Sequence, residues 1–251
     1  MIGLSTLEKR EITWINYMSV LRIVATPIGN LEDITLRALR VLKEADYILC
    51  EDTRTSGVLL SHYQIKTPTI SFHQHSGEIK IEKIVSLLKE DKNLVLITDA
   101  GTPGISDPGS KLVTLVREEI GEQVLIESVP GVSALTAAIS IAGAGFDRFL
   151  FLGFLPHKKG RQTMLREVFE SEYPSALYES KHRVLKLMDE LVKMSLELKI
   201  ELKISLAREL TKMHESFYEG SPEKIKETLL SNPNNQKGEF VVLIKKVKIK
   251  N

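Results

Sequence analysis

Short apolar runs alternate with helix-spaced segments through the first half of this chain, and this alternation constrains the fold more than any other sequence feature. The runs are as short as strands and almost continuously apolar, as expected for strands buried on both faces. They lie at 20–25, 47–50, 69–72, 94–98 and 124–127. The helix-spaced segments between them lie at 35–45, 53–61, 79–89 and 110–119. Strands that alternate with helices predict a parallel sheet covered on both faces.

The spacing also predicts which helix faces are buried. In the helix at 35–45, Leu36, Leu39 and Leu42 share one face, and Thr35 can cap its first turn. In the helix at 79–89, the inward residues are predicted to be Ile81, Ile84, Val85 and Leu88.

The rhythm changes near Pro130, where a second α/β segment begins. Strands are predicted at 148–154, 175–179, 203–208, 215–219 and 239–250. Helices are predicted at 132–142, 161–170, 182–193 and 222–230, with Pro222 suited to a first turn. This pattern favours a mixed sheet. The sequence therefore predicts an α/β protein with an N-terminal extension at 1–19 and two α/β domains at 20–128 and 129–251.

Composition excludes several classes of protein. The single cysteine, Cys50, rules out a disulfide framework and fits a reducing cytoplasm, and six scattered histidines give no zinc spacing. Residues 1–19 lack the apolar core of a signal peptide, and no apolar run has the length of a membrane span. We therefore expect a cytoplasmic protein without metal or membrane. The net charge of +1 requires that any RNA contact come from a local patch.

Polar, glycine-rich loops follow four of the predicted elements. They lie at 26–33, 50–54, 98–109 and 129–134. Ligands of open α/β sheets bind outside the carboxyl ends of the strands. Any one of these loops is most simply a turn, but four such loops together predict a binding site.

Three common nucleotide and hydrolase motifs are missing from the sequence. It contains no phosphate-binding G-x-x-x-x-G-K-[ST] loop and no G-x-G-x-x-G after the first strand. It also contains no G-x-S-x-G turn. P-loop nucleotidases, Rossmann dehydrogenases and α/β hydrolases are therefore disfavoured.

Eight segments carry a family resemblance in their order and spacing. They are VATPIGNLEDITLRAL, EDTRTSGVLL, TDAGTPGISDPG, VPGVSALTAA, GFLPHKKGR, YESKHR, ARELTKMHE and KGEFVVLI. Together they resemble the tetrapyrrole methylase superfamily, and within it the branch that methylates ribosomal RNA. The resemblance covers residues 20 to about 245. Lys181 departs from the pattern, because the family usually has proline there.

The resemblance implies a two-domain, homodimeric methylase that holds S-adenosylmethionine in a cleft between its domains. The implied reaction transfers a methyl group to the ribose 2′-hydroxyl of a decoding-centre cytidine in 16S rRNA of the small ribosomal subunit. It also implies a cofactor pocket of Asp99, Gly101, Thr102, Ile105, Ser133, Ala134, Tyr178 and Ala207. Ser133 and Ala134 begin a helix, whose N-terminus favours a carboxylate.

Catalytic candidates come from loop position alone. Asp52 and Asp107 are candidate bases, and Asn30 and Arg54 can hold the sugar or phosphate of the nucleotide. For each of the four, loop bracing is an equal alternative. Lys158, Lys159 and Arg161 follow a strand and are candidate phosphate contacts.

Two other functions stay open at this point. One is a corrin or porphyrin methylase, with the same fold and cofactor and a small-molecule substrate. The loop ATPIGN and the basic HKKGR segment argue against it. The other is a ribosome-assembly or cofactor-sensing module without turnover, which complete motifs in both halves disfavour.

Overall fold

The computed structural model describes residues 19–73, 76–107 and 109–247. The predicted N-terminal extension, apart from Ser19, and the predicted strand end at 248–250 lie outside these residues. Within the described part of the chain, no helix is long and apolar enough to cross a membrane. The same part contains no group of three or more His, Cys, Asp or Glu side chains placed to hold a metal ion.

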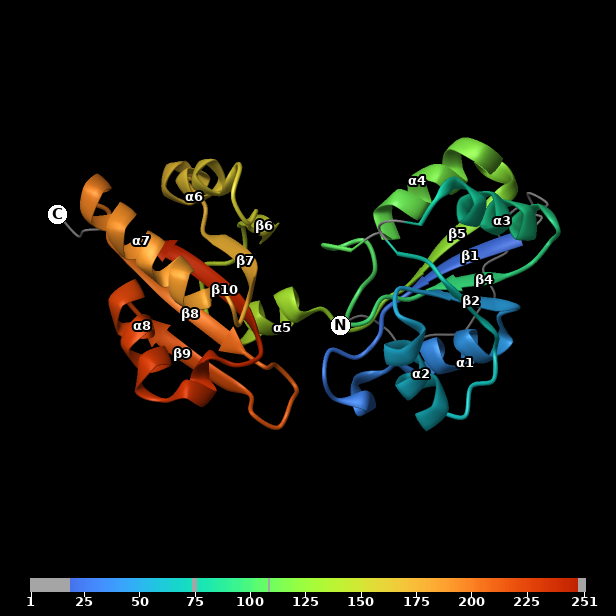
Figure 1. The fold of residues 1–251 in the computed structure, drawn as a ribbon, viewed down its shortest axis with the longest axis horizontal. Coiled ribbons are helices and arrows are strands. Elements are labelled where there is room, and N and C mark those ends of the chain that lie inside the picture. The colour runs from blue at the N-terminus through green and yellow to red at the C-terminus, as the bar shows by residue number, and fades with distance from the viewer. Residues whose placement is uncertain (1–18, 74–75, 108, 248–251) are drawn as a thin grey trace, which may run out of the picture. The chain divides into compact units, whose positions relative to one another are not determined.

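A sheet of five parallel strands in the order β3-β2-β4-β1-β5 forms the centre of the first unit. Its strands are β1 (Ser19–Val24), β2 (Tyr47–Cys50), β3 (Thr69–Ser71), β4 (Leu94–Leu96) and β5 (Val124–Val129). Its helices are α1 (Leu36–Glu44), α2 (Thr53–His62), α3 (Glu78–Lys89) and α4 (Gly109–Ile120). Helices α1 and α2 lie on one face of the sheet, and α3 and α4 on the other (Figure 1). The predicted parallel sheet is confirmed.

The buried helix faces follow the apolar spacing with one exception. In α3, Ile84, Val85 and Leu88 are buried, as predicted, and Ile81 is partly buried. In α1, however, Leu36 is 87% exposed. The buried face of α1 consists instead of Ala38, Val41 and Leu42, at i, i+3 and i+4. The prediction for Leu36 was wrong because Leu36 is the first residue of the helix and the buried stripe begins two residues later.

The second unit has a mixed sheet in the order β6-β7-β10-β8-β9, as predicted. Its strands are β6 (Leu150–Phe154), β7 (Ser175–Ser180), β8 (Leu202–Arg208), β9 (Ser216–Gly220) and β10 (Glu239–Lys246). Its helices are α5 (Ala134–Ile141), α6 (Arg161–Glu170), α7 (Val184–Leu198) and α8 (Pro222–Ser231). Only β6 and β7 pair in parallel, and every other pair is antiparallel. Helix α7 ends five residues after the predicted end at 193.

Strand β10 lies at the centre of this sheet and is buried on both faces. Phe240, Val242 and Ile244 pack into the core formed with α6, α7 and α8. Val241 and Leu243 point to the opposite face, where they pack with α5. Successive side chains of a strand alternate between faces, so a strand covered on both sides has a continuous apolar sequence. Among the described residues the strand ends at Lys246, and the predicted continuation at 248–250 lies outside them.

The two compact units are not two continuous halves of the chain. The first unit comprises residues up to Val24, then Leu36–Asp99 and Asp107–Val129. The second comprises Ala25–Thr35, Ala100–Ser106 and Pro130–Asn251. Two loops that follow strands of the first sheet therefore belong to the second unit. The predicted boundary at 128/129 lies one residue before the last of these crossings, which falls between Val129 and Pro130.

Candidate functional site

In the first unit, the loops that follow β2 and β4 are joined by a hydrogen bond. β2 and β4 are neighbouring parallel strands, so their carboxyl ends meet at one edge of the sheet. The backbone N–H of Asp52 donates to Oδ1 of Asp99 at 3.2 Å. Asp52 also caps α2, because its Oδ1 accepts from the backbone N–H of Arg54 at 2.8 Å. The structure thus brings together two predicted site residues, one catalytic and one cofactor-binding.

Asp52 forms a close ion pair with Arg54. The guanidinium donates to both carboxylate oxygens, at 3.1 Å to Oδ1 and 2.8 Å to Oδ2. These hydrogen bonds from the Arg54 side chain are the main reason that the pKa of Asp52 falls to about 2. A carboxylate with so low a pKa is a weak proton acceptor at neutral pH. The geometry favours the bracing alternative for Asp52, and its role as a base remains a prediction.

Glu51 is a site candidate that the sequence analysis missed. Burial raises its pKa, and the charges of Asp99 and Asp107 raise it further. Burial likewise raises the pKa of Asp99, with a smaller contribution from the charge of Asp52. Asp107 is half-buried, and its Oδ1 accepts from the backbone N–H of Gly109 at 2.7 Å. Glu51 stands directly after β2, and this position was the signal that could have identified it.

In the second unit, the loops at 26–30 and 100–106 are joined through their backbones. Thr26 and Gly101 form an isolated antiparallel bridge with N–H···O distances of 2.9 and 3.0 Å. Gly101 has a φ of +84°, in the left-handed region that favours glycine. Thr102 then donates its hydroxyl to the backbone oxygen of Val132 at 2.9 Å. Three of the four predicted loops therefore meet in this unit.

Tyr178 lies against the start of α5 in the same unit. Burial raises the pKa of Tyr178, while hydrogen bonds with the Ser133 side chain and the Leu135 backbone partly offset the rise. Ser133 is the N-cap residue of α5, but its side chain makes no capping hydrogen bond. The structure thus brings Ser133, Ala134 and Tyr178 together, as the predicted cofactor pocket requires.

Two phenylalanines that the sequence analysis missed extend this cluster. The ring centroids of Phe151 and Phe154 lie 5.1 and 5.4 Å from that of Tyr178. Phe154 is 51% exposed, which is unusual for a phenylalanine. Gly153 has a φ of +58° and lies against Ser106, where an added Cβ would be 2.9 Å from the Ser106 hydroxyl. Gly153, directly before Phe154, was the sequence signal for a close approach of the backbone at this point.

The remaining predicted cofactor residues differ in exposure. Ile105 is 38% exposed and lies on the loop that carries Gly101 and Thr102. Ala207 is fully buried and pairs with Val241 and Phe217 on either side. Its side chain belongs to the core beneath α5, and its role in the cofactor pocket remains a prediction.

Asn30 is held through both its side chain and its backbone N–H. Its side-chain Oδ1 accepts from the backbone N–H of Glu32 at 3.1 Å and caps a short 3-10 helix. Its backbone N–H donates to the Thr211 hydroxyl at 3.1 Å. These contacts match the bracing alternative, and a role in holding the nucleotide remains a prediction.

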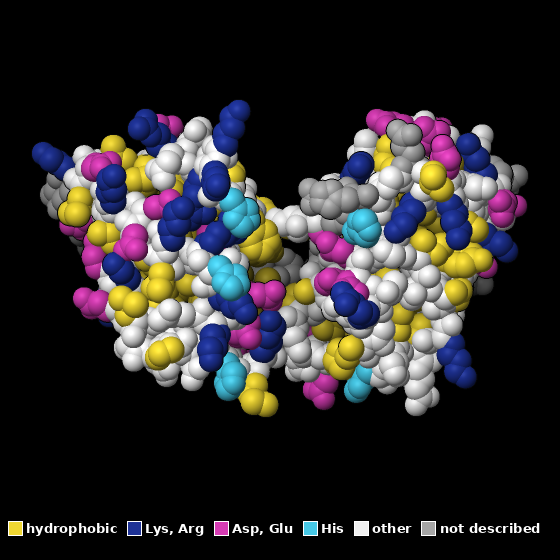
Figure 2. Space-filling view, in the orientation of Figure 1, with side chains coloured by type: hydrophobic (Ala, Val, Ile, Leu, Met, Phe, Trp, Pro, Cys, Tyr) yellow, Lys and Arg dark blue, Asp and Glu magenta, His cyan; other side chains and the backbone are white. Residues whose placement is uncertain are grey.

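The predicted phosphate contacts divide into two exposed lysines and one buried arginine. Lys158 and Lys159 are exposed, and basic side chains are plentiful on the surface of the second unit (Figure 2). Arg161 is only 2% exposed, and its guanidinium pairs with Glu190 at 2.8 Å and Glu179 at 3.5 Å. The prediction for Arg161 needs correction, because a guanidinium enclosed by two carboxylates cannot reach an RNA phosphate.

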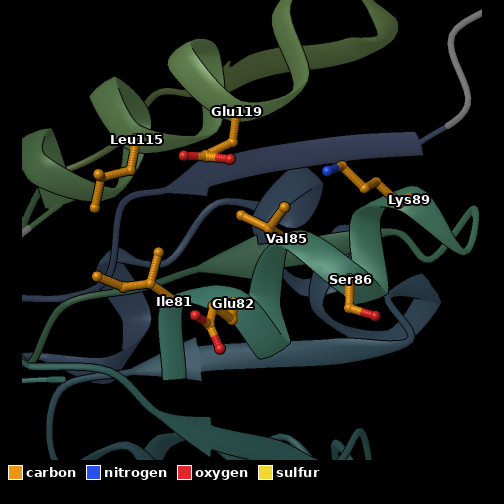
Figure 3. Close-up of a pocket in the computed structure, with 7 residues that line it drawn as sticks. All are labelled: Ile81, Glu82, Val85, Ser86, Lys89, Leu115 and Glu119. Carbon is orange, nitrogen blue, oxygen red and sulfur yellow. The ribbon is translucent and has the colours of Figure 1, made fainter. Parts of the chain in front are cut away.

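A pocket of about 530 Å³ lies between α3 and α4 on the first unit (Figure 3). It is lined by Ile81, Glu82, Val85, Ser86, Lys89, Leu115 and Glu119. None of these is a predicted site residue.

Comparison with known proteins identifies the family to which this chain belongs. Residues 20–226 match the model of the Tetrapyrrole (Corrin/Porphyrin) Methylases. The chain therefore belongs to the tetrapyrrole methylase family, and within it to the group whose members are named ribosomal RNA small subunit methyltransferase I. One relative, from Haemophilus influenzae, is 44% identical over 90% of this chain and 78% of its own length. Another, from a Hydrogenobaculum species, is 43% identical over 90% of this chain and 95% of its own.

Solved structures agree with the observed fold. Diphthine synthase matches 93% of this chain and 91% of its own with a TM-score of 0.69 and 14% identity. Uroporphyrin-III-C-methyltransferase from Thermus thermophilus matches 89% and 93% with a TM-score of 0.58 and 19% identity. At these identities the likeness supports the two-unit methylase fold and says nothing about the substrate.

Proposed function

We propose that this protein transfers a methyl group from S-adenosylmethionine to the ribose 2′-hydroxyl of a decoding-centre cytidine in 16S rRNA. The observation that carries the proposal is the joined loop system of Thr26, Gly101, Thr102 and Val132. It is supported by identity of 43–44% to relatives named for ribosomal RNA, over 90% of the chain.

The residues of the second unit fit an adenosyl group. Tyr178 and Phe154 offer apolar ring surface next to backbone groups, the usual combination of a cofactor site. The Thr26–Gly101 bridge fixes the loop that would lie against the ligand. We propose that Gly101, Thr102, Ile105, Ser133, Ala134 and Tyr178 bind the cofactor, with Ala207 beneath them.

The charges of the first unit fit the cationic part of the cofactor. S-adenosylmethionine carries a sulfonium and an ammonium group and supplies an electrophilic methyl. Asp99 is the last residue of the first unit before the chain passes to Ala100. Its carboxylate lies beside Asp52, and like charges at short range make the loop ready for a cation. We propose that Asp99 binds a positive group of the cofactor.

Catalysis in this proposal depends mainly on alignment of the hydroxyl with the methyl group. Correct positioning is worth up to about 7–11 kcal/mol in favourable cases. A base that accepts the hydroxyl proton typically adds a factor of about 10²–10⁴. Arg54 occupies both oxygens of Asp52, so Glu51 and Asp107 are the better candidates for the proton acceptor. Asn30 and Arg54 remain candidates for contact with the nucleotide.

Lys158 and Lys159 are the proposed phosphate contacts, and we propose a homodimer that acts in the cytoplasm. Two exposed lysines give a local patch on a chain with a net charge of only +1. A local patch suits recognition of an assembled subunit, which presents one defined surface. Contacts to phosphates predict methylation that weakens as salt rises.

A methyl-transfer assay tests the proposal. The purified protein would be mixed with labelled S-adenosylmethionine and small ribosomal subunits that lack this methylation, and the label mapped within the RNA. Label on one ribose in the decoding centre is the expected result. Cofactor binding without transfer to RNA would favour a corrin or porphyrin substrate. Absence of cofactor binding would leave only a module without turnover.

A further inference from the structure

The loop between β8 and β9 has a strained backbone. Glu209 and Thr211 have φ values of +51° and +66°, in a region that residues other than glycine rarely adopt. Such strain persists only where the surroundings enforce it, and it is found more often at functional sites. The loop spans residues 209–215 and joins the two strands at one end of the second sheet (Figure 1).

A buried arginine fixes the shape of this loop. Arg208 is 5% exposed, and its guanidinium donates to the backbone oxygens of Lys237 and Asn234 at 2.7 Å and of His214 at 2.8 Å. A guanidinium has five donors in a rigid plane, so these contacts fix several segments at once. Lys212 adds a second brace through its ion pairs with Glu209 at 2.9 Å and Glu239 at 2.8 Å.

The same loop contacts the first of the proposed cofactor loops. The Thr211 hydroxyl accepts from the backbone N–H of Asn30 at 3.1 Å. A Cβ added to Gly29 would lie 2.4 Å from Cγ of Lys212 and 2.9 Å from the Thr211 hydroxyl. The loop at 26–30 is in turn bridged to Gly101 through Thr26. The strained loop thus contacts the loop at 26–30, and that loop contacts Gly101, one of the proposed cofactor residues.

Met213 stands at the tip of this loop and is 94% exposed. An exposed apolar side chain is ordinary on a flexible surface. Here it is displayed by a strained and braced backbone, so its exposure is enforced. His214 and Glu215 beside it are also exposed.

The topology places Met213 at the same sheet edge as the proposed phosphate contacts. β6 and β7 are parallel, and both β7 and β8 are antiparallel to β10, so β6, β7 and β8 end at one edge. Lys158 and Lys159 follow β6, and Met213 follows β8. This edge therefore carries both exposed cations and an exposed apolar side chain, a combination suited to unpaired nucleotides.

We propose that Met213 packs against an unstacked nucleobase of the substrate RNA, beside the ribose that is methylated. This inference rests on the proposed function and deepens it. The base of a nucleotide inside structured RNA has to leave its stack before that nucleotide can enter an enclosed active site. Apolar side chains, including methionine, serve elsewhere as wedges between bases. The brace of Arg208 would hold the wedge in place while the nucleotide is displaced.

Kinetic comparison of Met213 variants with a matched control tests the proposal. M213A and M213E would be measured beside L196E, which places the same charge at another exposed apolar position, on α7. We expect M213A to reduce kcat/KM for small subunits about tenfold and M213E to reduce it further. L196E should stay within about twofold of wild type. Affinity for S-adenosylmethionine and the denaturation midpoint should be unchanged in all three variants.

A crosslinking experiment identifies the partner of Met213. A photoreactive phenylalanine in place of Met213 should form an adduct with rRNA next to the methylated nucleotide. Adducts only with a ribosomal protein, or M213A and M213E with wild-type kcat/KM, would overturn the inference while methylation by wild type keeps the proposed function. A wild-type protein that binds the cofactor but methylates no RNA would instead remove the proposed function itself.

Discussion

Both units place arginines beside carboxylates near the ends of strands, but they bury these charges to different extents. In the first unit, Arg54 of α2 is 90% exposed at the side chain and pairs with Asp52, the N-cap residue of that helix. In the second unit, Arg161 is 3% exposed at the side chain and pairs with Glu179 and Glu190. Arg183 completes the buried group, with its Nε 2.8 Å from Glu179. The same pair of residue types therefore does different work in the two units.

Burial decides the role of each pair. An exposed ion pair contributes little to stability, because water and salt screen it. In the exposed pair of the first unit, the Arg54 guanidinium remains accessible to a ligand. A buried ion pair matters to stability mainly because removal of one partner leaves the other charge buried and uncompensated, which destabilises the fold. Arg161 therefore belongs to the fold of the second unit, and a functional role for Arg54 remains a proposal.

The largest expected effect tests this assignment at the two arginines. Arg161→Ala should lower the free energy of unfolding by about 3 kcal/mol or more, because it leaves Glu190 without a cation, with only its hydrogen bond from Gln162, and leaves Arg183 as the one cation in contact with the buried Glu179. Arg54→Ala should leave the denaturation midpoint unchanged and reduce methyl transfer. Urea denaturation of both variants, with activity measured below the transition, checks the prediction. Equal destabilisation by the two variants would contradict it.

A second expected effect compares a glycine of the second unit with one of the first. Gly101→Ala forces a side chain into φ +84° with Ile28 only 3.4 Å from the added Cβ, and should cost about 1–2 kcal/mol and weaken cofactor binding. Gly57→Ala is the matched control, since Gly57 lies in α2 with open space around its Cβ position. It should stabilise the protein by about 0.5–1 kcal/mol. Thermal denaturation and calorimetric titration with S-adenosylmethionine measure both effects.

The sequence predicts most of the fold because the signals are local. Strands such as β2 are short apolar runs, and helices such as α6 are spaced with a clear period, so both could be located to the residue. The predicted end of β10 stays a prediction, because residues 248–250 lie outside the part of the chain that the structure describes. Leu36 was misplaced because the burial of a first-turn residue depends on what packs against that turn.

The candidate site was predicted at the level of loops and less well at the level of side chains. The motifs locate Thr26, Gly101, Thr102 and Ser133, and the structure joins Thr26 to Gly101 and joins Thr102 to Val132, the residue before Ser133. The sequence does not reveal that Arg161 is buried, because its acidic partners Glu179 and Glu190 are distant in the chain. It also does not reveal that Glu51 is the carboxylate with the raised pKa, because that shift depends on burial and on Asp99 and Asp107.

The smallest expected effect comes from Asp99→Asn, which should raise the stability of the protein slightly and weaken its binding of the cofactor. Its pKa is raised in the folded protein by burial and by the charge of Asp52. The stability associated with the neutral carboxyl is therefore present below its ordinary pKa and is lost as pH rises through the raised pKa. Asp99→Asn should accordingly be slightly more stable than wild type at neutral pH, with the difference vanishing in acid. Asn can still accept from the backbone N–H of Asp52.

The same substitution should weaken S-adenosylmethionine binding several-fold at neutral pH, because a neutral amide does not attract a cation. Wild-type binding should decline as pH falls through the raised pKa values of Glu51 and Asp99, while Asp52, with a pKa of about 2, stays ionised. Calorimetric titrations from acid to neutral pH, with Asp99→Asn beside wild type, measure both trends. If Asp99→Asn bound as tightly as wild type at every pH, the exposed charges of the first unit would not serve the cofactor. Of Asp99 and Arg54, only Arg54 would then keep a proposed functional role, in contrast to the buried charges that stabilise the second unit.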